Sequence, residues 1–180
     1  TPDGRRIVFY STRASGGNIY WQTADGTGAA ERLTTSTTVP HYPYSMSPDG
    51  KTLVFQETQR TTSVDLSLLL MEPKPRTEPL IHSTFIETNA EISPDGHWLA
   101  YQSNESGQEE IYVRPFPNVD GGRWQISTAG GTRPAWARSG RELFYLDASG
   151  FLTTAAVQTT PTFSASHSTR ILNTKYFSGF

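Results

Sequence analysis

The sequence predicts an all-β protein, a β-propeller or propeller segment of about four blades, each built from four antiparallel strands. Two observations lead to this prediction. The tetrapeptide "SPDG" occurs at residues 47–50 and 93–96, and the chain opens on "TPDG". The turn glycines Gly4, Gly50 and Gly96 follow one another at intervals of 46 residues, and a further step of 44 residues reaches Gly140 in "ARSGRELFY". A repeat of 44–46 residues that holds several short strands is typical of a propeller blade.

Each copy of the tetrapeptide is interpreted as a tight turn between the first and second strands of a blade. Proline presets the backbone of the second turn position, aspartate suits the third, and glycine takes the left-handed conformation that closes a hairpin. We therefore expect Gly50 and Gly96 to have positive φ angles. The positions three and five residues after each glycine stay apolar or aromatic in every copy: Ile7, Leu53, Leu99 and Leu143, then Phe9, Phe55, Tyr101 and Tyr145.

The repeat divides the chain into a single propeller domain over residues 1–180. Its blades are expected at residues 1–36, where the first strand is lacking, and at 37–84, 85–128 and 129–175. Residues 176–180, "YFSGF", would begin a further strand or close a ring beside residues 5–11. A blade that is cut leaves sheet edges uncovered, so we expect a homo-oligomer that associates through propeller edges.

Composition narrows the possible partners. The formal net charge is −2 with both signs interspersed, and without a basic stripe we expect no nucleic-acid partner. The chain has no cysteine, which excludes disulfides and thiolate metal sites. No apolar run approaches the roughly 18 residues of a membrane span, so no span is expected in this chain. Because the chain starts in mid-repeat, it is interpreted as part of a longer protein.

The repeats resemble those of TolB-type propellers. The resemblance rests on "ISPDGHWLAYQS" with "EEIYVRPF", on "MSPDGKTLVFQE", and on "TPDGRRIVFYS" with "NIYWQT". "YVRPFP" and "GGTRPAWARSGRELFYLD" are similar to the propeller that follows a kinase domain in some bacterial sensor proteins. The resemblance implies a propeller fold and favours a periplasmic or extracytoplasmic location, but a fold by itself does not imply a function.

No motif for catalysis or metal binding stands out. The repeated aspartates Asp3, Asp49 and Asp95 are interpreted as turn residues rather than calcium ligands. The sequence has no HExxH motif, no G-x-S-x-G elbow and no kinase HRD or DFG element. We therefore predict no enzyme activity, no cofactor and no metal. The tryptophans Trp21, Trp98, Trp124 and Trp136 fall on strand positions, where packing between blades is favoured over stacking on sugars or bases.

The remaining candidates lie on the loops that connect second to third strands and successive blades. These loops are polar, and loops on a rigid scaffold suit recognition. The function predicted is a non-catalytic binding or sensor module for a protein or a small ligand. Two alternatives stay open: the gating propeller of a prolyl-oligopeptidase-type serine hydrolase whose catalytic domain is absent, and a purely structural assembly unit. The candidate binding residues are Arg13, His41, Tyr42, Arg60, Glu87, Asn89, Glu105 and Arg133.

Overall fold

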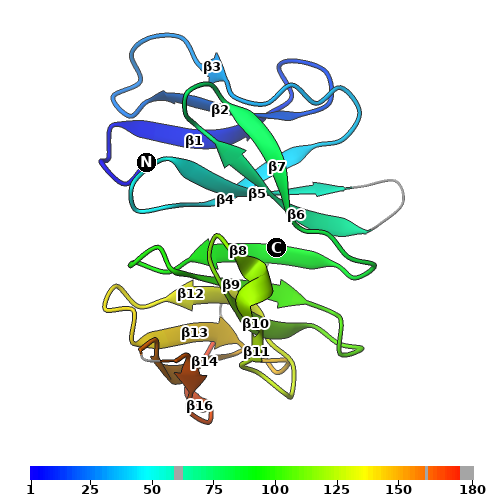
Figure 1. Cartoon of the computed structure of the whole chain (residues 1–180), viewed down its shortest axis with the longest axis vertical. Coiled ribbons are helices and arrows are strands. Elements are labelled where there is room, and N and C mark those ends of the chain that lie inside the picture. Colours follow the sequence, from blue (N-terminus) through cyan, green and yellow to red (C-terminus); the bar gives the residue numbers. More distant parts are fainter. Residues whose placement is uncertain (59–62, 161, 175–180) are drawn as a thin grey trace. The chain divides into compact units, whose positions relative to one another are not determined.

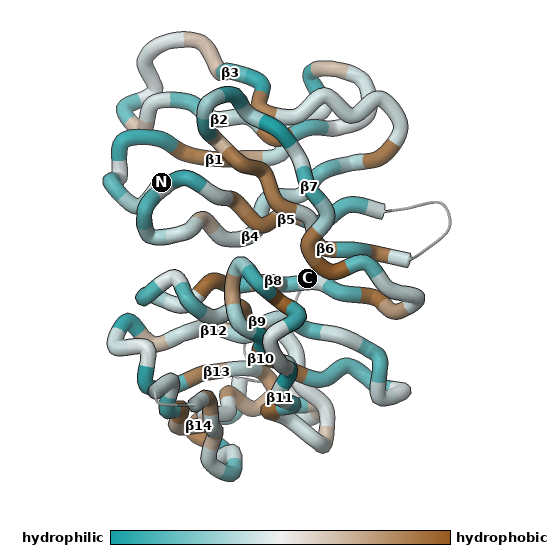
Figure 2. Tube along the Cα trace, in the orientation of Figure 1, coloured by the Kyte–Doolittle hydropathy of each residue, from teal (hydrophilic) through white to brown (hydrophobic). Residues whose placement is uncertain are grey.

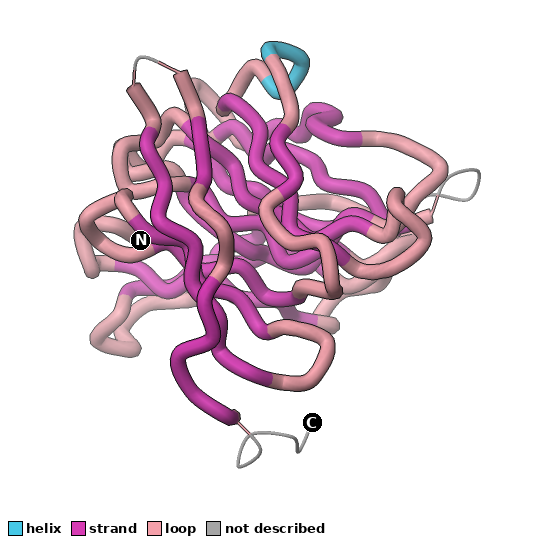
Figure 3. The backbone as a smooth tube through the Cα atoms, turned by 90° about the horizontal axis from the view of Figure 1, so that it is seen from below, coloured by secondary structure: helices cyan, strands magenta, loops and turns pink. Residues whose placement is uncertain are grey.

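The computed structural model describes residues 1–58, 63–160 and 162–174. These residues are all-β and form four antiparallel sheets and one short 3₁₀ helix (Figures 1 and 3). It divides into two compact units, Thr1–Thr88 (unit 1) and Asn89–Phe180 (unit 2). The expected fold class is confirmed. No helix in the described part of the chain is long and apolar enough to cross a membrane.

Unit 1 holds two sheets. The first sheet has three strands, β1 (Arg6–Ser11), β2 (Asn18–Thr23) and β3 (Glu31–Arg32), in that order. The second sheet has four strands in chain order: β4 (His41–Met46), β5 (Thr52–Thr58), β6 (Val64–Leu70) and β7 (Arg76–Ile81).

Unit 2 holds the other two sheets. The third sheet contains β8 (Glu87–Ile92), β9 (Trp98–Ser103), β10 (Glu110–Pro115) and β11 (Trp124–Gln125), with the helix η1 (Val119–Gly121) before its last strand. The fourth sheet contains β12 (Thr132–Trp136), β13 (Glu142–Leu146), β14 (Phe151–Gln158), β15 (Ser164–Ala165) and β16 (Thr169–Asn173). Both β15 and β16 pair with β14, so this sheet has five strands.

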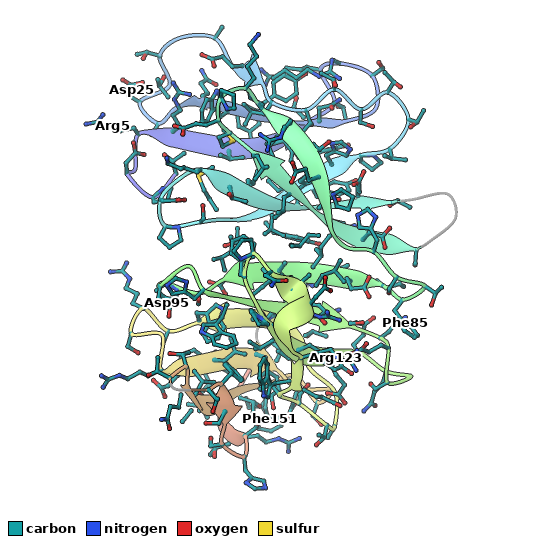
Figure 4. All side chains as sticks on the ribbon, viewed as in Figure 1. Arg5, Asp25, Phe85, Asp95, Arg123 and Phe151 are labelled. Atoms are coloured by element: carbon teal, nitrogen blue, oxygen red, sulfur yellow. The ribbon has the colours of Figure 1, made fainter. Side chains whose placement is uncertain are left out.

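The repeated turns have the predicted geometry. Gly50 and Gly96 have φ angles of 72° and 76° and lie between β4 and β5 and between β8 and β9. The carboxylate of Asp49 accepts hydrogen bonds from Lys51 N (3.0 Å) and Ser47 Oγ (2.6 Å). Asp95 makes the equivalent bonds in the next repeat (Figure 4). These aspartates are therefore turn residues, as the sequence indicated.

Alternate strand residues form a hydrophobic cluster in each unit, and Figure 2 shows the apolar stretches along the strands. In unit 1 the cluster includes Ile19, Phe55 and Leu69. In unit 2 it includes Ile111 and Leu143. All four tryptophans belong to these clusters or pack against them: Trp21 in unit 1, and Trp98, Trp124 and Trp136 in unit 2.

Two outer strands are shorter than expected. The sequence suggested strands over residues 30–35 and 123–127, but β3 and β11 each have two residues. Beyond each of them one backbone hydrogen bond continues the ladder, from Leu33 N to Ile19 O and from Ile126 N to Ile111 O, and a side chain takes the place of the next one. Thr34 Oγ1 accepts a hydrogen bond from the Ile19 amide at 3.0 Å, and Ser127 Oγ accepts one from the Ile111 amide at 2.8 Å. A serine or threonine hydroxyl can thus end a strand early without leaving a buried amide unpaired.

Candidate functional site

A groove in unit 1, called the unit 1 groove, lies beside the end of β3 and the second sheet. Its volume is about 540 Å³, within the range of small-molecule sites. The short β3 leaves this space, because the chain departs from the sheet after two paired residues. The lining residues are Leu33, Thr34, Thr35, Ser36, Val39, His41, Glu57, Pro75, Arg76 and Thr77.

A line of polar side chains runs from this groove across the second sheet. His41 Nε2 lies 3.5 Å from Glu57 Oε2, and Glu57 Oε1 accepts a hydrogen bond from the Ser67 hydroxyl. Ser67 Oγ also lies 3.0 Å from His82 Nε2. Since the single serine hydrogen goes to Glu57, His82 is the donor to Ser67. The line joins β4, β5, β6 and the end of β7.

Glu57 is held in its ionised form. The hydrogen bond from His41 lowers the pKa of Glu57, burial acts in the opposite direction, and the Ser67 hydrogen bond lowers the pKa further. His41 itself is only 7% exposed, and its Nδ1 is buried with no hydrogen-bond partner among the described residues. This imidazole therefore has one nitrogen fixed by the carboxylate and one nitrogen unsatisfied.

Unit 2 has a comparable groove, called the unit 2 groove, with a volume of about 430 Å³. Asp147 and Arg170 form its ion pair, with Arg170 Nε 2.6 Å from Asp147 Oδ2. Burial acts to raise the pKa of Asp147, but hydrogen bonds from Phe151 N, Arg170 and Ser149 N together lower it. The lining residues are Ile126, Thr128, Ala129, Gly130, Tyr145, Asp147, Thr153, Ala165, Ser166, His167, Ser168 and Arg170.

The two grooves are built at equivalent positions of the repeat. Glu57 and Asp147 each stand seven residues after their turn glycines, Gly50 and Gly140. Each groove is lined on one side by the segment that follows the outer strand of the preceding sheet. The corresponding residues of the other two repeats are Ser11 and Ser103, so only the second and fourth sheets carry a carboxylate there.

A second polar cluster, called the inner-strand cluster, lies within unit 2 and joins Asn89, Gln102 and Arg133. Asn89 Nδ2 donates to Gln102 Oε1 at 2.9 Å, and the Arg133 amide donates to the same oxygen at 3.3 Å. The Gln102 amide group donates in turn to Glu109 Oε2 at 2.8 Å. Asn89 and Arg133, which the sequence predicted as candidate residues, are thus brought together by Gln102, which it did not predict.

The other predicted residues lie apart from the grooves. Arg13 lies over the rings of Phe9 and Tyr20, and the ring of Tyr42 is 4.5 Å from that of Tyr10. Glu87 is buried and accepts a hydrogen bond from Ser83, and Glu105 is paired with Arg123 (Figure 4). Arg60 lies outside the described residues. Of the seven candidates that the structure describes, His41 is the one that lines either of these two grooves.

Sequence reasoning missed Glu57, Gln102 and Asp147. All three lie at or near the ends of second strands, where the candidate loops begin. The available signal was the repeat itself, because Glu57 and Asp147 share one register position and differ there from the serines of the other two repeats.

The fold agrees with solved propeller structures. A TolB-type protein from Agrobacterium tumefaciens matches with a TM-score of 0.74 and 19% identity, over 94% of this chain and 64% of that chain. TolB from Acinetobacter baumannii matches with a TM-score of 0.72 and 21% identity, over 94% of this chain and 42% of that one. The chain has a TolB-like propeller fold. At these identities the likeness shows the fold alone.

The likeness extends to a different class of protein. The apo form of prolyl oligopeptidase B from Galerina marginata matches with a TM-score of 0.65 and 11% identity, over 95% of this chain and 26% of that protein. No protein-family model matches the sequence, and no curated protein matches it. The chain spans under two thirds of the length of each of these three structures.

Proposed function

We propose that this chain is a non-catalytic recognition module that belongs to a longer protein and binds a small molecule or a protein segment. The observation that supports this most directly is His41 in the unit 1 groove, where a side chain only 7% exposed has an unpartnered Nδ1 among the described residues. A buried polar atom without a partner costs free energy, which a bound ligand can recover.

The one serine that contacts a histidine within the unit 1 network is a poor candidate for a nucleophile. Ser67 is 1% exposed, and its hydroxyl donates to Glu57 rather than to a histidine. A catalytic serine needs its hydroxyl hydrogen directed to the base and its oxygen open to substrate. The proposal therefore assigns recognition, and no turnover, to the chain itself.

The second candidate is a propeller that gates a serine hydrolase. The match to prolyl oligopeptidase B favours it. A G-x-S-x-G hydrolase domain encoded downstream of this segment would support it, and a kinase domain encoded upstream would support the sensor proposal. The comparisons do not bear on the kinase-linked subgroup, and that assignment stays a prediction. An extracytoplasmic location is likewise proposed on the TolB likeness alone.

The test is a thermal-unfolding screen of the chain against defined panels of sugars, amino acids, dipeptides and nucleotides. A compound that binds the folded state raises the unfolding midpoint. We expect at least one panel to do so and to shift the backbone amide NMR signals of residues 33–36 or 128–130. If no compound in any panel shifts the midpoint, the small-ligand form of the proposal fails. Hydrolysis of an ester, peptide or nucleotide that disappears with one groove substitution would replace recognition with catalysis.

A further inference from the structure

The two grooves share their ionisable groups as well as their position in the repeat. The unit 1 groove is lined by one carboxylate, one guanidinium and one imidazole, from Glu57, Arg76 and His41. The unit 2 groove has the same set, from Asp147, Arg170 and His167. The two linings come from different sheets with different sequences. The same three kinds of ionisable group therefore occur in two grooves that do not share a residue.

Both carboxylates are ionised at neutral pH, because the pKa of Glu57 and the pKa of Asp147 are lowered. Each carboxylate and guanidinium of the two linings already has a charged or imidazole partner: Glu57 lies beside His41, Arg76 beside Glu78, and Arg170 beside Asp147. A cationic ligand would have to compete with His41 for Glu57 or with Arg170 for Asp147, and these two carboxylates are largely shielded from water. An anionic ligand would have to compete with Glu78 for Arg76 or with Asp147 for Arg170, whose guanidinium groups are exposed. Such grooves favour a neutral ligand over an anion or a cation.

The rest of each lining is rich in hydroxyl groups. Thr35 and Thr77 are exposed in the unit 1 groove, and Thr128 is exposed in the unit 2 groove. A hydroxyl both donates and accepts, and a carboxylate has room for about four hydrogen bonds on its two oxygens. Glu57 uses one bond on each oxygen, so acceptor capacity remains. Aliphatic side chains such as Val39 and Ile126 supply apolar surface beside these groups.

His41 favours a ligand with a hydrogen-bond donor, because its ring nitrogen Nδ1 has no partner among the described residues. Its Nε2 faces Glu57, so in the neutral ring the hydrogen lies on Nε2 and Nδ1 is an acceptor. This nitrogen is buried in the unliganded protein, so a ligand hydroxyl that donates to it has to displace a neighbouring side chain, and the same hydroxyl can still accept from a threonine. A polyhydroxylated molecule satisfies the imidazole, the carboxylate and the hydroxyls together.

We infer that the two grooves are equivalent binding sites for neutral polyhydroxylated ligands, of the size of one or two sugar residues. The inference rests on the proposed recognition function and names its ligand class. Binding at each site is separate, so the chain binds two ligands. Glu57 and Asp147 accept hydrogen bonds from the ligand hydroxyls at their respective sites, and each site also has an imidazole, from His41 or His167.

The test uses three probes of one shape and different charge: glucose, glucosamine and glucuronate. Each is titrated into the chain at neutral pH, and backbone amide NMR signals report the two sites separately, residues 35 and 36 for the unit 1 groove and residues 128 and 129 for the unit 2 groove. We expect glucose to shift both sets. We expect glucosamine and glucuronate to bind several-fold more weakly.

Two variants and one control locate the binding. Glu57→Gln should weaken glucose binding about tenfold at the unit 1 groove and leave the unit 2 groove unchanged, because it removes a charge-assisted acceptor. Asp147→Asn should do the reverse. Within each variant the unaffected groove shows that the protein is folded. Asp25→Asn, in the exposed β2–β3 turn and labelled in Figure 4, should change neither site.

Tighter binding of a charged probe, or no binding of any probe, overturns the ligand class. The small-ligand form of the recognition proposal fails only if the amino-acid, dipeptide and nucleotide panels also give no shift. Equal loss at both grooves in either single variant overturns the assignment of two separate sites.

Discussion

Asn89 and Arg133 adopt the same left-handed backbone conformation and hydrogen-bond the same atom, Gln102 Oε1. Their φ angles are 51° and 55°, and these are the only positive values among the non-glycine residues that the structure describes. Each stands seven residues before a turn glycine, so they are equivalent in successive repeats. The corresponding residue of the second repeat is Pro43, whose ring forbids a positive φ. Gln102 thus stabilises two strained positions at once.

Replacing Arg133 with glycine should stabilise the fold. A non-glycine residue in this conformation costs about 1–2 kcal/mol, part of which is offset by the greater freedom of glycine in the unfolded chain. We expect a net gain of roughly 0.5–1 kcal/mol in the free energy of unfolding, measured by urea denaturation. Arg133→Val, which also removes the guanidinium, should destabilise because a β-branched residue tolerates this φ poorly. If the two substitutions change the free energy of unfolding equally, the backbone of Arg133 is not strained.

A valine at Gly96 should destabilise the protein through the turn. Its φ of 76° is strained for any residue with a β carbon, so we expect a loss on the order of 1–3 kcal/mol in thermal or urea unfolding. Gly50→Val tests the backbone strain without a steric clash, because an added β carbon at Gly50 meets no atom within 4 Å. Lys51→Val is the matched control at an exposed position with ordinary φ. If the glycine variants behave like this control, the turn assignment is wrong.

Such turns could be predicted from sequence because their chemistry is local. Proline, aspartate and glycine fix the backbone within four residues, and the repeat then orders the strands. The grooves and the inner-strand cluster could not be predicted in the same way. His41 and Glu57 meet only through the register of β4 with β5, and Gln102 meets Arg133 across 31 residues of chain. Loop position was a poor guide, since Tyr42 packs on Tyr10 and Glu105 pairs with Arg123.

The Glu57 carboxylate should give the folded state an acid-sensitive contribution to stability. Its pKa in the folded state lies below the ordinary value of 4.5, so the folded state binds fewer protons than the unfolded state around that pH. This contribution is fully present above pH 4.5 and is lost as the pH falls through the lower, folded-state pKa. Glu57→Gln should therefore lower stability at neutral pH and flatten its dependence on pH in this acidic range. An unchanged slope in urea unfolding series would contradict the assignment.

Glu91 should show the opposite dependence. Burial raises its pKa, and the Trp136 amide, which donates to Glu91 Oε2 at 2.9 Å, only partly opposes this. The folded state then binds more protons than the unfolded state, so stability falls as the pH rises from 4.5 through the folded-state pKa. Glu91→Gln keeps an acceptor for Trp136 and removes the buried charge. We expect this variant to be more stable than the wild type at pH 7 and equal to it or less stable near pH 4. A loss at pH 7 would show that the carboxylate is stabilising.

Self-association is the last prediction, and β16 is the place to test it. Ile171 and Leu172 are 54% and 56% exposed. The pairing of β16 with β14 shifts register between Arg170 and Leu172, so Ile171 lies at a bulge, and its side chain and that of Leu172 are both uncovered. Strand edges with uncovered apolar side chains favour association. We expect sedimentation equilibrium to show a mass that rises with concentration and that falls to the monomer mass when both residues are replaced by threonine, which keeps the strand propensity.

The variant Ile7→Thr, at the exposed apolar position of β1, tests whether the first sheet also contributes to association. A strict monomer at high concentration in the unmodified chain would refute association through these edges. The proposed ring-closing strand at residues 176–180 lies outside the described residues.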